Sequence, residues 1–274
     1  MRADRRALLV GAGAFSLAGV AQADVPLTLQ GRFQQGGHVI GRTAPRALVY
    51  VDGEALTQAS AAGWFFVGFD RDAAGSAEIV VRDGRMEARR TLTLARGTFP
   101  ITRVNGLPPS TVEPSAPDLL ARIEREVAVK AEGFASRIDA DDFHAGFAWP
   151  LDQIRVTSAW GAQRVLNGTP ARPHYGIDLG ATQGTPIRAP GPGVVALAEP
   201  DLHFEGGLTL IDHGQGLISA YLHQSRIEVR RGDQVTRGQI VGRVGALGRA
   251  TGPHLCWRLK WRDRNLDPSL MIVA

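Results

Sequence analysis

Two stretches of the C-terminal half share one pattern, and this pattern decides its fold. Residues 184–198 read GTPIRAPGPGVVALA, and residues 232–246 read GDQVTRGQIVGRVGA. Each begins with glycine, places Ile187 or Val235 three residues later, and then passes through a turn into an apolar strand. Glycine tolerates the sharp corners that closely spaced strands require. The two stretches therefore predict similar β-hairpins in a β-rich domain.

A further strand is predicted within residues 250–261, ATGPHLCWRLKW, which carry the only cysteine of the chain. Its polar residues His254, Cys256 and Arg258 alternate with apolar ones. Side chains two positions apart on a strand point to the same face. We therefore expect a histidine and a thiol side by side on one face.

Short alternating runs separated by turns fill residues 24–105, for example ALVYVDGEAL, GWFFVGFD and AEIVVRDGR. Asp52-Gly53 and Asp83-Gly84 are typical of hairpin turns. About seven short strands of this kind predict a small immunoglobulin-like β-sandwich. Because no cluster of chemically active side chains occurs there, we interpret this region as an accessory domain for spacing or docking.

Residues 106–147 are predicted to be a Pro-rich linker followed by one amphipathic helix of about six turns. Ser115 and Asp118 resemble a capping box at its start. The apolar face of the helix is formed by residues at helical spacing, namely Leu119, Ile123, Val127, Phe134 and Ile138. This face is free to pack on either domain or on a partner.

Composition limits the classes to which the chain can belong. Its 274 residues suffice for about two domains, and a hydrophobic content of 44% allows a core. The net charge is +4, and most of the cations are arginines. This basicity favours anionic partners such as nucleic acid, lipid headgroups or an anionic wall polymer, unless it is only a compositional bias. Since long runs of like charge are absent, nucleic-acid binding is disfavoured.

Residues 1–23, MRADRRALLVGAGAFSLAGVAQA, predict a secretory signal peptide that ends in an A-x-A cleavage site before Asp24. The apolar run is too short for an ordinary membrane span. Arg5-Arg6 also fits a twin-arginine signal; the alternative is a buried N-terminal helix. Export places the protein in an oxidising compartment, where Cys256 is buried, paired with another molecule, or held by another group.

Zinc-ligand residue types recur between residues 172 and 256. The segment RPHYGIDLG contains His174 and Asp178, with Gly176 between them to allow a bend. Imidazole, carboxylate and thiolate all bind zinc, and a catalytic zinc needs three protein ligands and an open position. The segment SAYLHQS adds His223 to the candidates. The remaining histidines are interpreted as surface, turn or isolated residues, namely His38, His144, His203 and His213.

These motifs occur in one order over about residues 150–270, together with the ending LDPSL. As a set they resemble the lysostaphin/LytM-type zinc endopeptidases, the peptidoglycan-cutting metallopeptidases of family twenty-three. The resemblance implies that residues 148–274 form an antiparallel β-sandwich of the duplicated hybrid-motif type. The upstream sandwich, linker and helix are more loosely similar to the accessory region of secreted Gram-negative members.

The resemblance also implies roles for individual residues. The H-x-x-x-D motif of the family assigns two zinc ligands to His174 and Asp178, and its Y-x-H strand assigns a catalytic histidine to His223. Its H-x-H motif assigns a second catalytic histidine to His254 and a third ligand to Cys256, where the family has histidine. Thiolate binds zinc well, but it lowers the net charge of the centre. The alternative for Cys256 is a small buried hydrophobe, which leaves two ligands.

The function that the resemblance implies is hydrolysis of peptide cross-links in bacterial peptidoglycan by a periplasmic zinc metalloendopeptidase. Residues 159–172 are expected to line its groove, and Tyr175 and Trp257 to serve in packing. The expected partner is peptidoglycan, with no nucleic acid and no transmembrane segment after signal cleavage. Three alternatives remain: an inactive LytM-type protein that regulates a wall amidase or other envelope protein, a sugar-phosphotransferase carrier domain, and a structural envelope protein.

Overall fold

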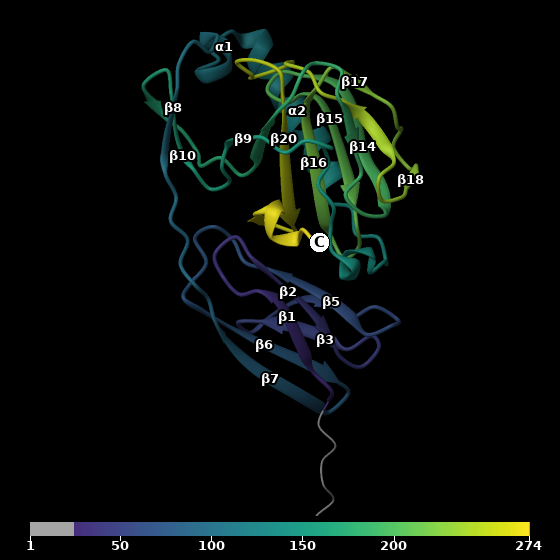
Figure 1. The fold of residues 1–274 in the computed structure, drawn as a ribbon. Coiled ribbons are helices and arrows are strands. Elements are labelled where there is room, and N and C mark those ends of the chain that lie inside the picture. Colours follow the sequence, from purple (N-terminus) through teal and green to yellow (C-terminus); the bar gives the residue numbers. More distant parts are fainter. Residues whose placement is uncertain (1–24, 274) are drawn as a thin grey trace, which may run out of the picture.

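The computed structural model describes residues 25–273, so the predicted signal peptide lies outside the described residues. The described chain is mainly β, as predicted, and consists of two β units joined by an extended segment and a helix (Figure 1). Among the described residues, no helix combines the length and the apolar character needed to cross a membrane.

The N-terminal unit contains seven strands in two antiparallel sheets, which confirms the predicted immunoglobulin-like sandwich. The strands are β1 (Thr28–Arg32), β2 (His38–Arg42), β3 (Leu48–Val51), β4 (Glu54–Gln58), β5 (Trp64–Gly68), β6 (Ser76–Asp83) and β7 (Met86–Thr93). The sheet orders are β1-β2-β5 and β4-β3-β6-β7.

Two hairpins of this unit test the turn predictions. Asp52 and Gly53 connect β3 to β4 with positive φ at both residues, as a type I′ turn requires. In the second hairpin Asp83 pairs with Met86, so the turn is one residue later than predicted, at Gly84-Arg85.

The linking segment contains two helices, α1 (Pro109–Val112) and α2 (Pro117–Phe134). The predicted capping box does not form, because Ala116 occupies the N-cap position and no side chain caps the helix. The helix ends before Ile138. It packs on the large C-terminal sheet at Gly133, where a side chain would lie 2.9 Å from Leu210 and 3.0 Å from Leu197.

The buried face of α2 differs from the predicted one. Val127 is 54% exposed, whereas Glu126 is buried. The carboxylate of Glu126 accepts a hydrogen bond from the backbone N–H of His203 at 2.8 Å and pairs with Arg122 at 2.6 Å. These partners allow a carboxylate to replace an apolar side chain in the interface.

The C-terminal unit contains one large antiparallel sheet with strand order β18-β14-β15-β16-β20-β12-β9, in which β21 also pairs with β20. Its strands are β9 (Val156–Ser158), β12 (Ile177–Gly180), β14 (Gly193–Leu202), β15 (Gly206–Asp212), β16 (Leu217–Gln224), β18 (Gln234–Val235), β20 (His254–Trp261) and β21 (Arg264–Leu266). A smaller sheet has the order β13-β19-β17, with β13 (Pro186–Arg188), β17 (Arg226–Ile227) and β19 (Ile240–Arg243).

The two similar stretches of sequence interlock in this unit. The first strand of one copy, β13, pairs with the second strand of the other, β19, placing Ile187 opposite Gly242. Reciprocally, β14 of the first copy pairs with β18 of the second, with Gly193 opposite Val235. Their apolar side chains share one core with the inner face of the large sheet, including the fully buried Trp257. Helix α2 covers part of the other face.

A fifth sheet connects the two units. Strand β8 (Ile101–Val104) lies in the range predicted for the accessory domain, but it pairs in parallel with β10 (Gln163–Leu166), which also pairs with β11 (Thr169–Pro170). In Figure 1 this sheet stands beside the large C-terminal sheet, on the side of β9.

The N-terminal unit contacts the C-terminal end of β20. Phe66 lies 6.1 Å from Trp261, the last residue of β20, between ring centroids. The side chain of Gln215 accepts a hydrogen bond from the backbone N–H of Phe66, and Asp70 accepts one from the backbone N–H of Asn265. Two 3₁₀ turns lie near this boundary, at Asp142–Ala145 and Pro268–Met271.

Candidate metal centre

Three side chains of metal-binding type converge at the start of β20. One ligand atom from each of His174, Asp178 and Cys256 lies within 4.8 Å of the others. Nε2 of His174 is 3.0 Å from Oδ1 of Asp178 and 3.3 Å from Sγ of Cys256. All three residues are buried. The structure therefore brings together the three residues predicted as metal ligands.

The backbone explains this convergence. Asp178 on β12 is the direct register partner of Cys256 on β20. His174 reaches the same point from the loop before β12, which passes over β20 at Gly176. A side chain there would lie 2.8 Å from Cγ of Arg258 and 2.9 Å from Sγ of Cys256. The glycine predicted to allow a bend thus makes room for the site itself.

The donor set fits a metal cation. Oδ1 of Asp178 is a buried carboxylate oxygen with no hydrogen-bond donor assigned to it among the described residues, and its nearest polar neighbour is Nε2 of His174. Nδ1 of that ring faces the hydroxyl of Ser158 at 3.2 Å, which orients Nε2 toward the centre. Three electron-pair donors facing one point repel one another unless a cation or a proton lies between them.

Burial dominates the electrostatics of the site. It raises the pKa of the Cys256 thiol to about 12, with a further contribution from Asp178. Burial alone would also raise the pKa of Asp178, but the neighbouring ring of His174 and the charge of Arg164 hold it well below its usual range. A thiol ligand must lose its proton, so metal binding at this centre is coupled to proton release.

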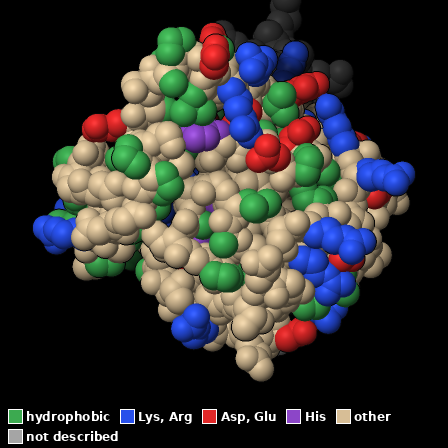
Figure 2. Space-filling model, turned by 90° about the horizontal axis from the view of Figure 1, so that it is seen from above, with side chains coloured by type: hydrophobic (Ala, Val, Ile, Leu, Met, Phe, Trp, Pro, Cys, Tyr) green, Lys and Arg blue, Asp and Glu red, His purple; other side chains and the backbone are tan. Residues whose placement is uncertain are grey.

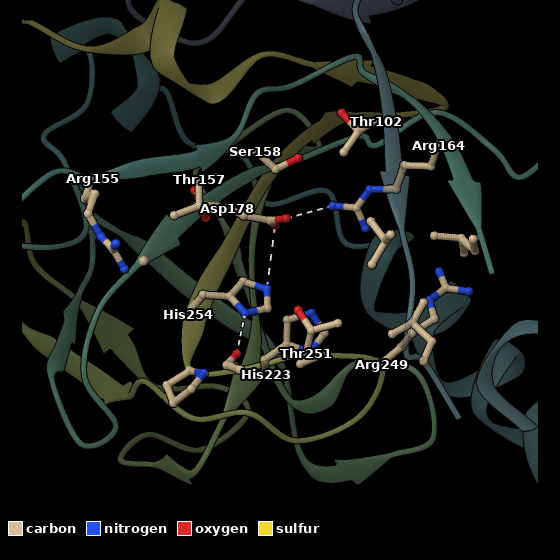
Figure 3. A pocket seen from close by; sticks show the side chains of 17 residues that line it. Thr102, Arg155, Thr157, Ser158, Arg164, Asp178, His223, Arg249, Thr251 and His254 are labelled. Carbon is tan, nitrogen blue, oxygen red and sulfur yellow. Dashed lines mark hydrogen bonds and ion pairs between the residues drawn. The ribbon is translucent and has the colours of Figure 1, made fainter. Parts of the chain in front are cut away.

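Two further histidines stand beside the triad. The rings of His223 and His254 are 4.7 Å apart between centroids, and Nε2 of His254 is 3.7 Å from Oδ1 of Asp178 (Figure 3). Each Nδ1 lies 2.8 Å from a backbone carbonyl, of Leu247 and Gly252 respectively. Since a carbonyl only accepts, both Nδ1 atoms carry the proton, and both Nε2 atoms are free to accept one.

The backbone at His223 is unusual. Its φ is +65°, a left-handed conformation that costs free energy for a residue with a side chain. Burial, followed by the nearby His254, lowers the pKa of His223 to about 3, so the ring is uncharged at neutral pH. An uncharged imidazole at this place offers Nε2 as a hydrogen-bond acceptor.

A cavity of about 340 Å³ opens onto these histidines, on a face of the molecule that is visibly hollowed (Figure 2). Arg164 and Leu166, from the segment that was expected to line the groove, form part of its wall. Strand β8 adds Thr102 and Val104, and the loop before β9 adds Arg155. Sequence reasoning missed these last three residues.

Comparison with known proteins identifies this unit. Residues 172–268 match the profile of peptidase family M23. The C-terminal unit is a domain of peptidase family M23. The predicted resemblance to lysostaphin/LytM-type endopeptidases is thereby confirmed at the level of the family.

Relatives of the M23 domain have described activities of their own. The chain is 37% identical over 121 residues to the peptidoglycan DD-endopeptidase ShyA of Vibrio cholerae, covering 43% of this chain and 28% of that protein. It is 41% identical over 107 residues to ShyC of the same organism, covering 39% and 24%. The chain thus spans about a quarter of the length of these curated relatives.

One solved structure is similar over both units. It is a crystal structure of a protein from Pseudomonas aeruginosa described as an M23 peptidase, with a TM-score of 0.66 and 28% identity. The similarity covers 88% of this chain and 95% of that one. The two-unit arrangement therefore recurs with an M23 domain.

The other aromatic and histidine predictions have mixed outcomes. Trp257 is fully buried, as expected of a packing residue, and Tyr175 is partly buried against the same core, beside a second cavity. His213 lies in the turn between β15 and β16, as predicted, but its ring is fully buried and bonded to Ser219 Oγ at 2.7 Å. His38 is also buried and stacks on Phe66.

Proposed function

We propose that this protein is a zinc-dependent endopeptidase that cleaves peptide cross-links of peptidoglycan in the periplasm. The observation that carries the proposal is the geometry of five neighbouring residues, of which Asp178, His223 and His254 line the first cavity. Three of them, His174, Asp178 and Cys256, offer ligand atoms at one point, and His223 and His254 stand beside them. Membership of family M23 and the activities described for ShyA and ShyC support this reaction class.

The proposed ligands are His174, Asp178 and Cys256, a donor set that suits zinc. A zinc ion held there would supply a Lewis acid for the peptide carbonyl and would activate water. The thiolate and the carboxylate together cancel the formal charge of Zn²⁺. With a histidine as third ligand, the centre would keep a net positive charge. Without this charge, hydrolysis depends more strongly on the proton acceptors that the protein itself supplies.

His223 and His254 are proposed to move protons. Because each Nδ1–H is bound to a backbone carbonyl, Nε2 of either ring can take a proton from the attacking water. A ring that has taken this proton becomes a donor, and it can then protonate the nitrogen that leaves. The two carbonyls belong to the loop between β19 and β20 and hold both rings in place, so the positions of the rings do not depend on the substrate.

Hydrolysis of purified peptidoglycan tests this function. Zinc-loaded protein comprising residues 24–274 is incubated with the polymer, and the released fragments are separated and weighed by mass spectrometry. We expect cross-linked dimers to be converted to monomers, and His223→Ala to slow the conversion by a factor of about 10²–10⁴. Unchanged cross-links after incubation with zinc-loaded protein would contradict the proposal.

A further inference from the structure

A second cavity adjoins the candidate metal centre, and its wall is strongly cationic. It shares Arg164 and Arg249 with the first cavity and includes the predicted ligand His174. Five basic side chains and one acidic side chain, that of Asp263, line it. The basic ones are Arg164, Arg172, Arg249, Arg258 and Lys260.

Most of these cations lack an acidic partner inside the protein. Among the described residues only Arg164 forms an ion pair, with Oδ2 of Asp178 at 2.7 Å. The Nε atoms of Arg164 and Arg258 are buried and have no hydrogen-bond acceptor. Partly buried guanidinium groups are usually paired, because losing hydration without a partner costs free energy. Unpaired donors that line a cavity therefore indicate a ligand from outside the chain.

The three arginines come from separate elements, namely β10, β20 and the loop between β19 and β20. Arg249 is held in place by Phe204, 5.1 Å from its guanidinium carbon, and by a hydrogen bond to the backbone oxygen of Thr111. Burial, followed by Arg258 and Arg164, lowers the pKa of Arg249, which reflects how closely the three charges gather.

The position of the cluster relates it to the reaction centre. In Figure 3, Arg164 and Arg249 lie on one side of Asp178 and His254, and Arg155 lies on the other. A peptide whose cleaved bond lies at the centre therefore extends one flanking group toward the three arginines. Guanidinium groups pair with carboxylates through two parallel hydrogen bonds, a geometry that a neutral amide cannot match.

We propose that Arg164, Arg249 and Arg258 form a carboxylate-binding subsite beside the metal centre. The enzyme then selects peptides that carry a free carboxylate next to the cleaved bond over peptides that are neutral there. This inference rests on the proposed function, since it concerns the substrate of the same site. Arg164 also pairs with Oδ2 of Asp178, and Arg258 also lies beside the thiol of Cys256, so both arginines connect the subsite to the metal centre.

The test uses two synthetic peptides. Each contains one amide bond that joins two carbon centres of D configuration. The two peptides differ only at the D-configured carbon that is attached to the nitrogen of this bond. This carbon carries a carboxylate in one peptide and a carboxamide in the other. Binding of each peptide to zinc-loaded His223→Ala protein is measured by calorimetry, so that hydrolysis is not required. We expect the carboxylate peptide to bind about tenfold or more tightly, as hydrogen bonds to a charged group imply.

Variants connect this preference to the cluster. In the same background, Arg249→Gln is expected to reduce the preference to less than about threefold, and Arg249→Lys to give an intermediate value. Arg85→Gln removes the same charge from an exposed hairpin turn and should leave the preference unchanged. Arg258→Gln repeats the test at a second position, with zinc content and circular dichroism reporting the fold.

The outcomes separate the inference from the proposed function. Equal affinity for the two peptides, or a preference unchanged in both Arg249→Gln and Arg258→Gln, would overturn the subsite. Displacement of the peptide by inorganic phosphate as easily as by acetate would also overturn it, in favour of a general anion site. By contrast, a carboxylate preference in binding without hydrolysis of peptidoglycan by the unmutated protein would leave the subsite standing and remove the proposed function.

Discussion

Asp178 and Cys256 face each other across one strand pair, in direct register between β12 and β20. Their side chains meet Nε2 of His174 at distances of 3.0 and 3.3 Å. Two of the three proposed ligands therefore belong to paired strands, whose register fixes their separation. A site on paired strands keeps its geometry better than one built on loops.

The close approach at Gly176 leads to a first prediction. Gly176→Ala places a methyl group 2.9 Å from Sγ of Cys256 and 3.1 Å from the backbone oxygen of Trp257. We expect zinc affinity to fall and stability to decrease by about 1–3 kcal/mol, as in other overpacked cores. Zinc titration and urea unfolding measure the two effects.

Gly75→Ala is the matched control, since no atom lies within 4 Å of the added carbon there. It should bind zinc as the unmutated protein does. Normal zinc binding by Gly176→Ala would show that the loop over β20 can shift without cost.

A second prediction separates catalysis from metal binding. His223→Ala should retain zinc, because His223 is outside the triad, but it should reduce hydrolysis by a factor of about 10²–10⁴ as expected for loss of a general base. His144→Ala, at an exposed position far from the cavity, is the control. Loss of zinc in His223→Ala would refute this division of roles.

The accessory unit offers a prediction about pH. Burial, followed by the charge of Arg32, lowers the pKa of His38 to about 4 from an ordinary 6.5. Between these values the unfolded chain binds a proton that the folded chain does not, so stability is lost as pH falls below about 6.5. Between pH 7 and pH 5 this residue alone should cost about 2 kcal/mol.

Urea unfolding at the two pH values, compared between the unmutated protein and His38→Phe, measures this cost. Other buried histidines are present in both proteins and cancel in the comparison. The variant should lose about 2 kcal/mol less on acidification. An identical loss in both would mean that His38 takes up its proton while folded.

The sequence predicted those features that local pattern determines. Alternation and glycine spacing indicated strands in both units and the repeated hairpins, and the resemblance to the family placed His174, Asp178 and Cys256 in one ligand set. Pairing between distant segments was less accessible. The parallel pairing of β8 with β10 has no local signature, so the contribution of Thr102 to the cavity was missed.

Other errors share a physical cause. The exposed Val127 and the buried Glu126 reverse the helical pattern, because partners elsewhere in the chain neutralise the carboxylate. His213 is in a turn, as predicted, but its burial was not foreseen, because Ser219 and the carbonyl of Pro192 supply its hydrogen bonds in the interior. A polar residue can be buried wherever the tertiary structure pairs it, and sequence spacing does not show those pairs.

The central claim is that Cys256 is the third ligand of a zinc site. The most direct test measures zinc per chain in protein comprising residues 24–274, purified under reducing conditions, alongside Cys256→Ser and Cys256→His. The account predicts about one zinc in the unmutated protein, little in Cys256→Ser because a hydroxyl is a poorer zinc ligand, and about one in Cys256→His. Little zinc in the unmutated protein but full occupancy in Cys256→His would contradict it, because the thiol would then be a buried apolar group in a site that had lost one ligand.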